Sequence, residues 1–232
     1  MHFFLGRLLA LTGLQANASG MHYLITAGPT REALDPVRYL SNRSSGRMGF
    51  ALAGAAARAG HRVTLIAGPV ELPSPAAVQR IDVVSAQDMY EAVAREIGLA
   101  DVAVFAAAVA DYRPAAVSAQ KIKKEQSRLT LELERTPDIL GAVRPVFRWN
   151  GLLAGFAAET ENLEDYAREK LERKGCDLII ANDVSLPGIG FDATDNEVSI
   201  ICRDGRTLRL PLMSKVELAG RIIELIDAER NR

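Results

Sequence analysis

The feature that most constrains this fold is the alternation of uniformly apolar segments with segments of helical periodicity. β-prone apolar segments occupy residues 22–28, 62–68, 81–85, 101–109, 151–159 and 177–183. Helical segments lie between several of them, at 50–60, 86–98 and 162–175. A strand that is apolar at every position is buried on both faces, which is typical of parallel sheets. The alternation predicts an α/β, Rossmann-like three-layer fold, with a mostly parallel sheet and helices on both faces.

The rest of the chain departs from this alternation. Residues 128–135 alternate with period two, which predicts a half-exposed strand. Residues 136–147 predict a short helix with Thr136 as its N-cap and Pro137 at its first position. Residues 197–212 predict a β-hairpin turning at Asp204-Gly205, and 214–230 a closing helix. The expected fold therefore ends in a C-terminal β-hairpin extension and a helix capped by Ser214.

Length and charge narrow the class of protein. The chain has 232 residues, of which 48% are hydrophobic, so we expect a single domain over 21–232 after an extension over 1–20 that is disordered or a linker. The formal net charge of -1 argues against a nucleic-acid partner. No apolar stretch reaches the roughly 20 residues of a membrane span, so no membrane partner is expected. The two cysteines suggest neither zinc nor disulfides, which fits a cytoplasmic setting.

A polar loop follows the first predicted strand. Ligands of parallel sheets bind beyond the carboxyl ends of the strands, where the loops after residues 28, 109, 159 and 183 should converge. In the first loop, residues 41–49 read SNRSSGRMG. Glycines that let a ligand approach the backbone, serine hydroxyls and a helix N-terminus can together bind an anion. A solvated loop with an N-cap serine explains the same residues equally well. No dinucleotide fingerprint or P-loop is present.

Three further features carry both a functional and an ordinary explanation. Asp111, at the end of the 101–109 strand, could bind a ribose or a metal, or be a turn aspartate. The run KIKK (121–124) could bind phosphates, or be a solvated basic loop. Lys170 and Lys174 share one helix face and could form a binding pair, or they could be surface cations that the dipole stabilises near the C-terminus of the helix. Tyr166 and Lys170 match the Tyr-x-x-x-Lys pair of short-chain dehydrogenases, but the serine those enzymes need is missing.

Groups for nucleophilic or histidine-based catalysis are scarce. His2, His22 and His61 fall outside the predicted site, and no Gly-x-Ser-x-Gly elbow occurs. The predicted site would work by positioning and charge, as nucleotidyl-transfer sites do.

Taken together, several stretches resemble one family. They occur in the order and spacing of phosphopantothenate–cysteine ligases of coenzyme A biosynthesis, over about residues 21–229. The stretches that carry the resemblance are ITAGPTREALDPVRYLSNRSSGRMG, AAVADYRP, KIKK, TPDIL, GFAAET, YAREKLERKGCDLIIAND and GIGFDATDN. The resemblance implies a ligase that activates the carboxylate of 4'-phosphopantothenate with CTP, as an acyl-cytidylate, and releases pyrophosphate. The amine of cysteine then forms the amide and releases CMP, with Mg²⁺ accompanying the nucleotide.

The resemblance also implies roles for individual residues. Asn42 would hold the acyl-cytidylate through its amide donor, and Lys121 would contact the nucleotide phosphates in one of the two catalytic steps. The nucleotide-binding set would be Asp111, Lys121, Pro137, Asp138, Ile139, Leu140, Phe156, Lys170 and Lys174. The substrate phosphate would be held by Ser44, Ser45, Gly46 and Arg47. Mg²⁺ would be bound mainly through the nucleotide phosphates, with Asp111 as a candidate ligand.

Assembly and nucleotide choice also follow from the resemblance. Members of the family are homodimers in which part of the site is completed across the interface. Many bacterial members carry the ligase on the C-terminal side of a flavin-dependent decarboxylase, so this chain would be a stand-alone ligase or an excised half. The resemblance then implies that this chain binds no flavin, and that a separate decarboxylase is a possible partner. Eukaryotic relatives prefer ATP, whereas KIKK and TPDIL favour CTP. A nicotinamide-dependent reductase and a non-catalytic nucleotide sensor are the alternatives.

Overall fold

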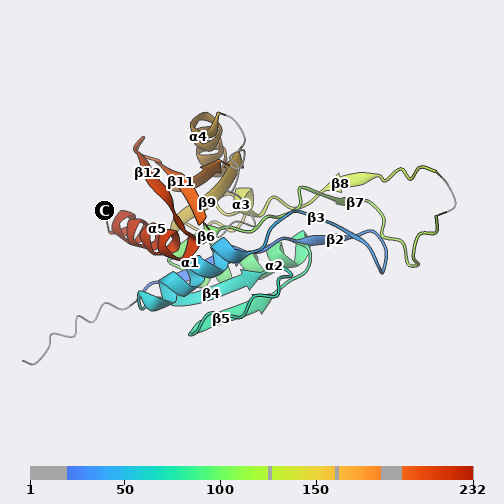
Figure 1. Ribbon diagram of the computed structural model, residues 1–232, viewed down its shortest axis with the longest axis horizontal. Coiled ribbons are helices and arrows are strands. Elements are labelled where there is room, and N and C mark those ends of the chain that lie inside the picture. The colour runs from blue at the N-terminus through green and yellow to red at the C-terminus, as the bar shows by residue number, and fades with distance from the viewer. Residues whose placement is uncertain (1–19, 125–126, 160–161, 184–194, 232) are drawn as a thin grey trace, which may run out of the picture.

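An eight-stranded sheet forms the centre of the computed structural model, which describes residues 20–124, 127–159, 162–183 and 195–231 (Figure 1). The strand order is β12-β11-β10-β9-β6-β1-β4-β5. Neighbours from β10 to β5 run parallel, and β11 and β12 add an antiparallel hairpin at one edge. The strands are β1 His22–Ala27, β4 Arg62–Ala67, β5 Val78–Asp82, β6 Val102–Phe105, β9 Leu152–Glu159, β10 Leu178–Asp183, β11 Asp195–Cys202 and β12 Thr207–Ser214. The predicted mostly parallel sheet with a C-terminal hairpin is confirmed.

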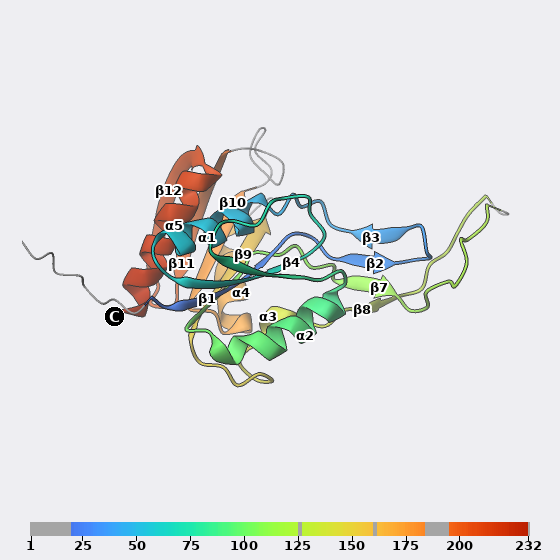
Figure 2. The same ribbon diagram turned by 90° about the horizontal axis from the view of Figure 1, so that it is seen from below.

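Helices cover both faces of this sheet (Figure 2). The helices are α1 Arg47–Arg58, α2 Ala86–Glu96, α3 Ile139–Ala142, α4 Leu163–Lys174 and α5 Lys215–Arg230, with a 3₁₀ turn over Ile97–Leu99. Tyr23 and Ile25 of β1 pack into the core beneath α1 and α5, whereas Leu24 packs into the core beneath α2, α3 and α4. This alternation along a strand separates the two cores, and it confirms the three-layer arrangement.

Two short antiparallel ribbons project from the sheet and were not predicted as such. The first arm (residues 31–41) pairs β2 Arg31–Ala33 with β3 Tyr39–Ser41, and the second arm (residues 112–124 and 127–135) pairs β7 Tyr112–Pro114 with β8 Leu133–Arg135. Figures 1 and 2 show them side by side, extending away from the helices. The Ile122 N–H donates to Asp35 Oδ2 at 3.1 Å, and Arg38 donates to the Ile122 carbonyl at 2.9 Å. The arms therefore hold each other through a buried carboxylate.

Local hydrogen bonds move several predicted boundaries. The predicted strand at 81–85 lies instead at Val78–Asp82, because Ser85 forms a capping box with Asp88 that starts α2. The strand predicted over 128–135 is reduced to Leu133–Arg135, and its residues are exposed rather than half-exposed. The helix predicted to start at 50 starts at Arg47, and β6 ends at Phe105 rather than at 109.

The short helix α3 starts later than its sequence suggests. Asp138, not Thr136, is its N-cap, and the Asp138 carboxylate accepts from the Gly141 N–H at 2.9 Å. The Thr136 hydroxyl donates instead to the Ala110 carbonyl at 2.5 Å. Thr136 therefore ties the loop after β6 to the loop before α3, and Pro137 precedes the helix. The predicted cap of α5 is confirmed, since Ser214 accepts from the Glu217 N–H.

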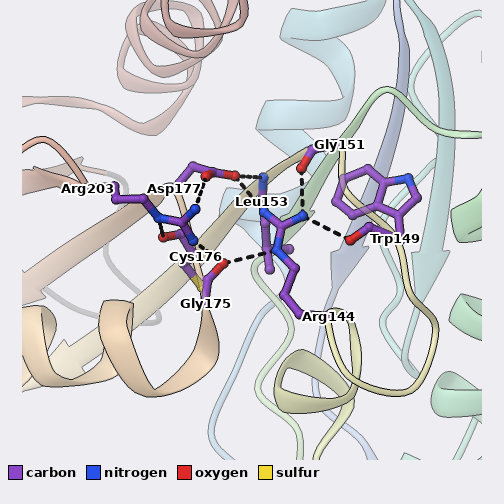
Figure 3. A network of polar contacts seen from close by, with 8 residues as sticks. All are labelled: Arg144, Trp149, Gly151, Leu153, Gly175, Cys176, Asp177 and Arg203. Carbon is purple, nitrogen blue, oxygen red and sulfur yellow. Dashed lines mark hydrogen bonds and ion pairs between the residues drawn. The ribbon is translucent and has the colours of Figure 1, made fainter.

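The edge at the amino ends of the strands is closed by a network around Arg144 (Figure 3). The Arg144 guanidinium donates to Asp177 Oδ2 at 2.8 Å and to the carbonyls of Trp149, Gly151 and Gly175. The Asp177 carboxylate also accepts from the Leu153 N–H, and it pairs with Arg203. Every polar group at the centre of this network bonds another group of the same edge, so the network fastens strand ends rather than shaping a catalytic site.

Within the described part of the chain, no helix is long and apolar enough to cross a membrane.

Candidate functional site

The loops at the carboxyl ends of the parallel strands enclose two adjoining clefts. The nucleotide cleft, named for the residues predicted to contact a nucleotide, has a volume of about 530 Å³ and lies toward α3 and α4. The serine cleft, named for Ser44 and Ser45, has a volume of about 350 Å³ and lies toward α1 and α5. Both are lined by a common wall of Ala107, Val109, Asp111, Phe156 and Lys170. The clefts therefore meet over the ends of β6 and β9, where ligands of such sheets bind.

The nucleotide cleft gathers nearly all residues predicted to contact a nucleotide. Its lining includes Asp111, Pro137, Asp138, Ile139, Leu140, Phe156, Lys170 and Lys174. These residues come from the loop after β6, the start of α3, the end of β9 and one face of α4. Segments that are far apart in the sequence thus converge on one cavity, as the loop-convergence argument predicted.

The cations of the nucleotide cleft exceed its acids. Of the residues that the structure describes there, Arg135, Lys170, Arg173 and Lys174 line it together with two carboxylates, Asp111 and Asp138. Lys174 pairs with Asp138, and its side chain is only 12% exposed. Burial alone would raise the pKa of Asp138, but the bonds from Lys174 and from the Gly141 N–H outweigh it and hold that pKa below its usual value. Asp138 is therefore ionised at neutral pH, and the excess positive charge of the cleft suits a polyphosphate.

Lys170 stands in the wall between the clefts. Its Nζ donates to the Phe156 carbonyl at 2.8 Å, which ties α4 to the end of β9. The nearby Tyr166 is 42% exposed and lines neither cleft. The Tyr-x-x-x-Lys spacing therefore does not place a tyrosine beside Lys170 in the site, which disfavours the reductase alternative.

The serine cleft brings the polar loop SNRSSGRMG to the start of α1. Asn42, Ser44, Ser45, Gly46 and Arg47 all line it. Gly46 is the N-cap of α1, at φ 74°, and among the described residues no side chain caps this helix or places an acid in its first turn. As far as the described residues go, the first N–H groups of α1 border the cleft with no capping carboxylate, which is an anion-binding arrangement.

The two glycines of this loop have different roles from the ones we predicted. Both were expected to let a ligand approach the backbone. A Cβ at Gly49 would instead lie 2.4 Å from the Ala27 Cβ, so Gly49 permits close packing of α1 on β1. Gly46 is required by its left-handed backbone, where a Cβ would also lie 3.1 Å from Val70.

Asn42 contacts the backbone of the wall between the clefts. Its Nδ2 donates to the Val109 carbonyl at 2.9 Å and to the Ala108 carbonyl at 3.3 Å. The Asn42 amide nitrogen, which was predicted to contact the acyl-cytidylate, is thus hydrogen-bonded to the loop after β6. Contact with an acyl-cytidylate, which stays a prediction, requires the Asn42 amide to exchange one of these bonds or to use its oxygen.

Lys121 is the one predicted residue that lines neither cleft. It lies on the second arm, beside Ile122, whose backbone is bonded to Asp35 and Arg38 of the first arm. The arms project away from the central sheet (Figure 1). Lys121 therefore does not share a cleft with Asn42 and Asp111, which both line the serine cleft.

Several lining residues were missed by sequence reasoning. Arg173 follows Lys170 by one helical turn, and this spacing could have revealed it. Asn182 and Asn196 lie within the quoted stretches LIIAND and GIGFDATDN, whereas Lys215 and Arg135 carry no local signal. Most of the loop predicted after residue 183, and Thr160 and Glu161 after β9, lie outside the described residues. Among the residues that are described, no group of three metal-ligating side chains occurs.

Comparison with known proteins assigns the chain to a family. Residues 18–229 match the family described as the DNA/pantothenate metabolism flavoprotein C-terminal domain. The chain is 51% identical, over 209 residues, to the coenzyme A biosynthesis bifunctional protein CoaBC of Vibrio cholerae, covering 89% of this chain and 52% of the relative. It is 48% identical over 206 residues to the protein of that name from Escherichia coli strain K12, covering 88% of this chain and 50% of the relative. The chain thus spans about half the length of these relatives.

A solved structure agrees with these relatives. The crystal structure of the C-terminal domain of a CoaBC protein superimposes with a TM-score of 0.78 and 43% identity, covering 90% of this chain and 95% of that chain. The fold, the family match and the relatives agree over the same residues. The chain therefore belongs to the family of the DNA/pantothenate metabolism flavoprotein C-terminal domain.

Proposed function

We propose that this chain is a phosphopantothenate–cysteine ligase of coenzyme A biosynthesis that uses CTP. One observation carries the proposal: residues assigned by resemblance to a nucleotide and to an acyl-cytidylate line two clefts with a common wall. A bisubstrate reaction through an acyl-nucleotide needs this arrangement, because the nucleotide and the carboxylic acid must meet at one point. Membership of a family whose relatives are named coenzyme A biosynthesis proteins supports the same reaction.

The nucleotide cleft supplies charge and an apolar surface. Lys170, Arg173 and Lys174 would offset the negative charge that accumulates on the phosphates during transfer. Leu140 and Phe156 give the cytosine and ribose apolar contacts. Among the described residues, Asp111 is the only carboxylate of the common wall. It fits Mg²⁺, which proteins hold through one or two carboxylates together with substrate phosphates, and the bound ion would supply further charge neutralisation there.

The proposed chemistry needs no protein nucleophile. The carboxylate oxygen of 4'-phosphopantothenate attacks the α-phosphorus of CTP, forming the acyl-cytidylate and releasing pyrophosphate. The cysteine amine then attacks the acyl carbon, loses a proton, and releases CMP. Consistent with this chemistry, no cysteine or histidine lines either cleft among the described residues. Cys176 and Cys202 are buried elsewhere.

The test is a product assay on the purified chain. With CTP, Mg²⁺, 4'-phosphopantothenate and cysteine, we expect equal amounts of CMP, pyrophosphate and amide. Asn42→Asp should form the amide poorly while remaining folded, whereas the control Asn150→Asp, outside both clefts, should retain activity. Replacing CTP by ATP decides the nucleotide preference. Binding of CTP without CMP or pyrophosphate would contradict the proposal and indicate a nucleotide sensor.

We further propose that the ligase is a homodimer joined through its arms. Leu129, Leu131 and Leu133 alternate along the second arm and are 58%, 37% and 44% exposed. Exposed apolar side chains that follow one another along a projecting arm are suited to burial against a second copy of the chain. The pairing would carry Lys121 toward the clefts of the partner. The thiol product would be the substrate of a decarboxylase on a separate polypeptide or on a longer version of this chain.

A further inference from the structure

The first arm contains a buried carboxylate that the proposed chemistry does not use. Asp35 lies between β2 and β3, and its side chain is 0% exposed. A carboxylate is rarely buried to this extent unless its charge is compensated, because removing the charge from water is costly. The donors that compensate Asp35 therefore show what it holds in place.

One oxygen of Asp35 closes the turn of the first arm. The N–H groups of Val37 and Arg38 both donate to Asp35 Oδ1, at 2.9 Å each. The chain reverses at this point, since the Leu34 N–H donates to the Arg38 carbonyl at 2.8 Å. Aspartates commonly stabilise such a reversal by accepting from backbone N–H groups a few residues later. This half of the carboxylate therefore acts within the first arm.

The other oxygen of Asp35 reaches the second arm. Asp35 Oδ2 accepts from the Arg38 guanidinium, at 3.0 Å from Nε and 2.6 Å from Nη2, and from the Ile122 N–H at 3.1 Å. Arg38 Nη2 also donates to the Ile122 carbonyl at 2.9 Å. A further bond between the arms runs from the Ser118 N–H to the Leu34 carbonyl, at 3.0 Å. Both polar groups of the Ile122 backbone are thus bonded to Asp35 and Arg38.

The segment that Asp35 holds carries the lysine run KIKK (121–124). Among the described residues between β7 and β8, no helix or strand occurs, so the ladder of the second arm does not extend to this segment. Lys121 and Lys123 directly flank Ile122, and both are exposed. The position of their backbone is therefore set by the bonds of Ile122 to the first arm.

We propose that Asp35 is the positioning residue for Lys121, because it fixes the backbone from which this lysine reaches the nucleotide phosphates. This role rests on the proposed function, which gives Lys121 its contact with those phosphates. A charge that is held in place before the reaction needs no reorganisation during it. A free loop would instead lose conformational entropy each time a nucleotide binds. Asp35 acts through Lys121 and has no contact with the nucleotide itself.

The substitution Asp35→Asn separates the two halves of the carboxylate. The bonds from Arg38 and from the backbone N–H groups hold the pKa of Asp35 well below its usual value, so both oxygens accept at neutral pH. Asparagine keeps one acceptor oxygen, which suits the turn, and places an amide donor where Oδ2 meets the donors of Arg38 and Ile122. Glu134→Gln is the matched control, because it also replaces a carboxylate of an arm by an amide, at an exposed pair with Arg113.

Hydrogen exchange tests the structural part of the proposal without turnover. In Asp35→Asn we expect the Ile122 amide to exchange about 10- to 100-fold faster than in the wild type, the range for losing a hydrogen bond to a charged group. The amides of β1 should exchange as in the wild type, and so should the Ile122 amide in Glu134→Gln. Unchanged exchange of the Ile122 amide in Asp35→Asn overturns the inference.

A double-mutant cycle with Lys121→Ala tests the functional part. The measured quantity is the affinity for CTP with Mg²⁺, by calorimetry. Asp35→Asn should lower this affinity about 10-fold in the wild-type chain, and should have almost no effect in Lys121→Ala, because the group that Asp35 positions is then missing. An equal loss in both backgrounds overturns the inference. A loss that accompanies a change in the mass of the assembly, measured by light scattering, assigns Asp35 to assembly and also overturns it.

A second variant serves if Asp35→Asn does not fold. Arg38→Lys keeps a positive charge beside Asp35 but lacks the fork that reaches the Ile122 carbonyl. Unchanged exchange and unchanged CTP affinity in Arg38→Lys would then overturn the inference. Because neither measurement needs turnover, a chain that binds CTP through Lys121 but forms no CMP contradicts the ligase function and leaves the role of Asp35 standing. A chain that forms CMP while both measurements stay unchanged in the variants does the reverse.

Discussion

Replacing Gly49 by alanine would test whether the position of α1 controls the chemistry of the serine cleft. Gly49 lies in the first turn of α1, directly against β1. A Cβ built there lies 2.4 Å from the Ala27 Cβ, 3.0 Å from the Ala27 Cα and 3.2 Å from the Thr26 carbonyl oxygen. Two of the three atoms belong to the backbone of a central strand, so the start of the helix must move instead.

The size of the effect follows from these distances. Carbon atoms in contact lie about 3.5–4.0 Å apart, so the helix start must shift by about 1 Å. Overpacking of this kind costs about 1–3 kcal/mol, offset by up to about 1 kcal/mol from the helix preference of alanine over glycine. We expect a net loss of about 1–2 kcal/mol in the free energy of unfolding, which lowers Tm by about 2–8 °C in a domain of this size.

We expect the catalytic rate of Gly49→Ala to fall by a larger factor than its loss of folding stability alone would cause. A displacement of about 1 Å at a positioning element can cost about 100-fold in rate. The assay is CMP release at saturating CTP, with Tm measured by calorimetry on the same preparations. Gly54→Ala is the matched control on the same helix, because its Cβ would meet the flexible end of Arg58 at 3.2 Å and Pro75 at 3.5 Å. That variant should be as stable as the wild type and as active.

A second substitution makes the reasoning refutable. Ala27→Gly removes the nearest atom, so the double variant should recover part of the Tm and rate that Gly49→Ala loses, as a favourable coupling in a double-mutant cycle. Wild-type stability and activity in Gly49→Ala would refute the argument. Equal losses in Gly54→Ala would show that any added methyl disturbs α1, and would remove the special role of the contact with β1.

The arms and the buried thiol allow two further predictions. If Lys121 acts in the partner's clefts, Asn42→Asp and Lys121→Ala chains should each be inactive alone. A one-to-one mixture should then recover about 25% of wild-type activity after subunit exchange, since half of random dimers are mixed and each contains one intact site. No recovery would place Lys121 in the site of its own protomer, and an active Lys121→Ala chain would place it outside catalysis. Burial raises the pKa of Cys176 to about 12, so the thiol stays neutral in the folded chain while it ionises near 9 in the unfolded chain. The contribution of the neutral thiol to the free energy of unfolding is therefore complete below about pH 9, and it falls by up to about 1.4 kcal/mol per pH unit above it. Urea unfolding measured at pH 8 and pH 10 should show a smaller decline in the free energy of unfolding for Cys176→Ala than for the wild type.

Sequence patterns predicted the central sheet because its strands are apolar along their whole length. His22–Ala27 and Leu178–Asp183 fall within one residue of their expected bounds. Of the four arm strands, only β8 falls within a predicted strand, at the end of the segment 128–135. β2, β3 and β7 were missed because each is only three residues long, too short for a periodicity to distinguish it from a loop. Thr136 illustrates another limit of prediction from local sequence patterns. It precedes a proline, which predicts a helix N-cap, but its hydroxyl donates to the carbonyl of Ala110, which is far away in the sequence.

The site was predictable where chemistry and strand ends coincide. Asp111 lies in the loop after β6 and Phe156 in the carboxyl-terminal half of β9, and topology brings such positions to one edge. The place of Lys215 in the lining of the serine cleft was not predictable, because a lysine in the first turn of an amphipathic helix normally faces water. Lys215 borders the cleft because α5 packs beside α1. Lys121 shows the converse: its motif indicates a phosphate contact, yet its place is set by an arm that the sequence does not reveal.

Asn42 connects the two clefts physically, although it lines only one of them. The segment that separates the clefts is the loop after β6, and its backbone is fastened from two sides. The Asn42 amide donates to the Ala108 and Val109 carbonyls, while Thr136 holds the Ala110 carbonyl from the side of the nucleotide cleft. Movement of Asn42 toward a substrate would release one of these bonds and loosen the wall that the nucleotide also contacts. The backbone from Ala108 to Ala110 is thus held by one side chain that lines the serine cleft and one that lines the nucleotide cleft.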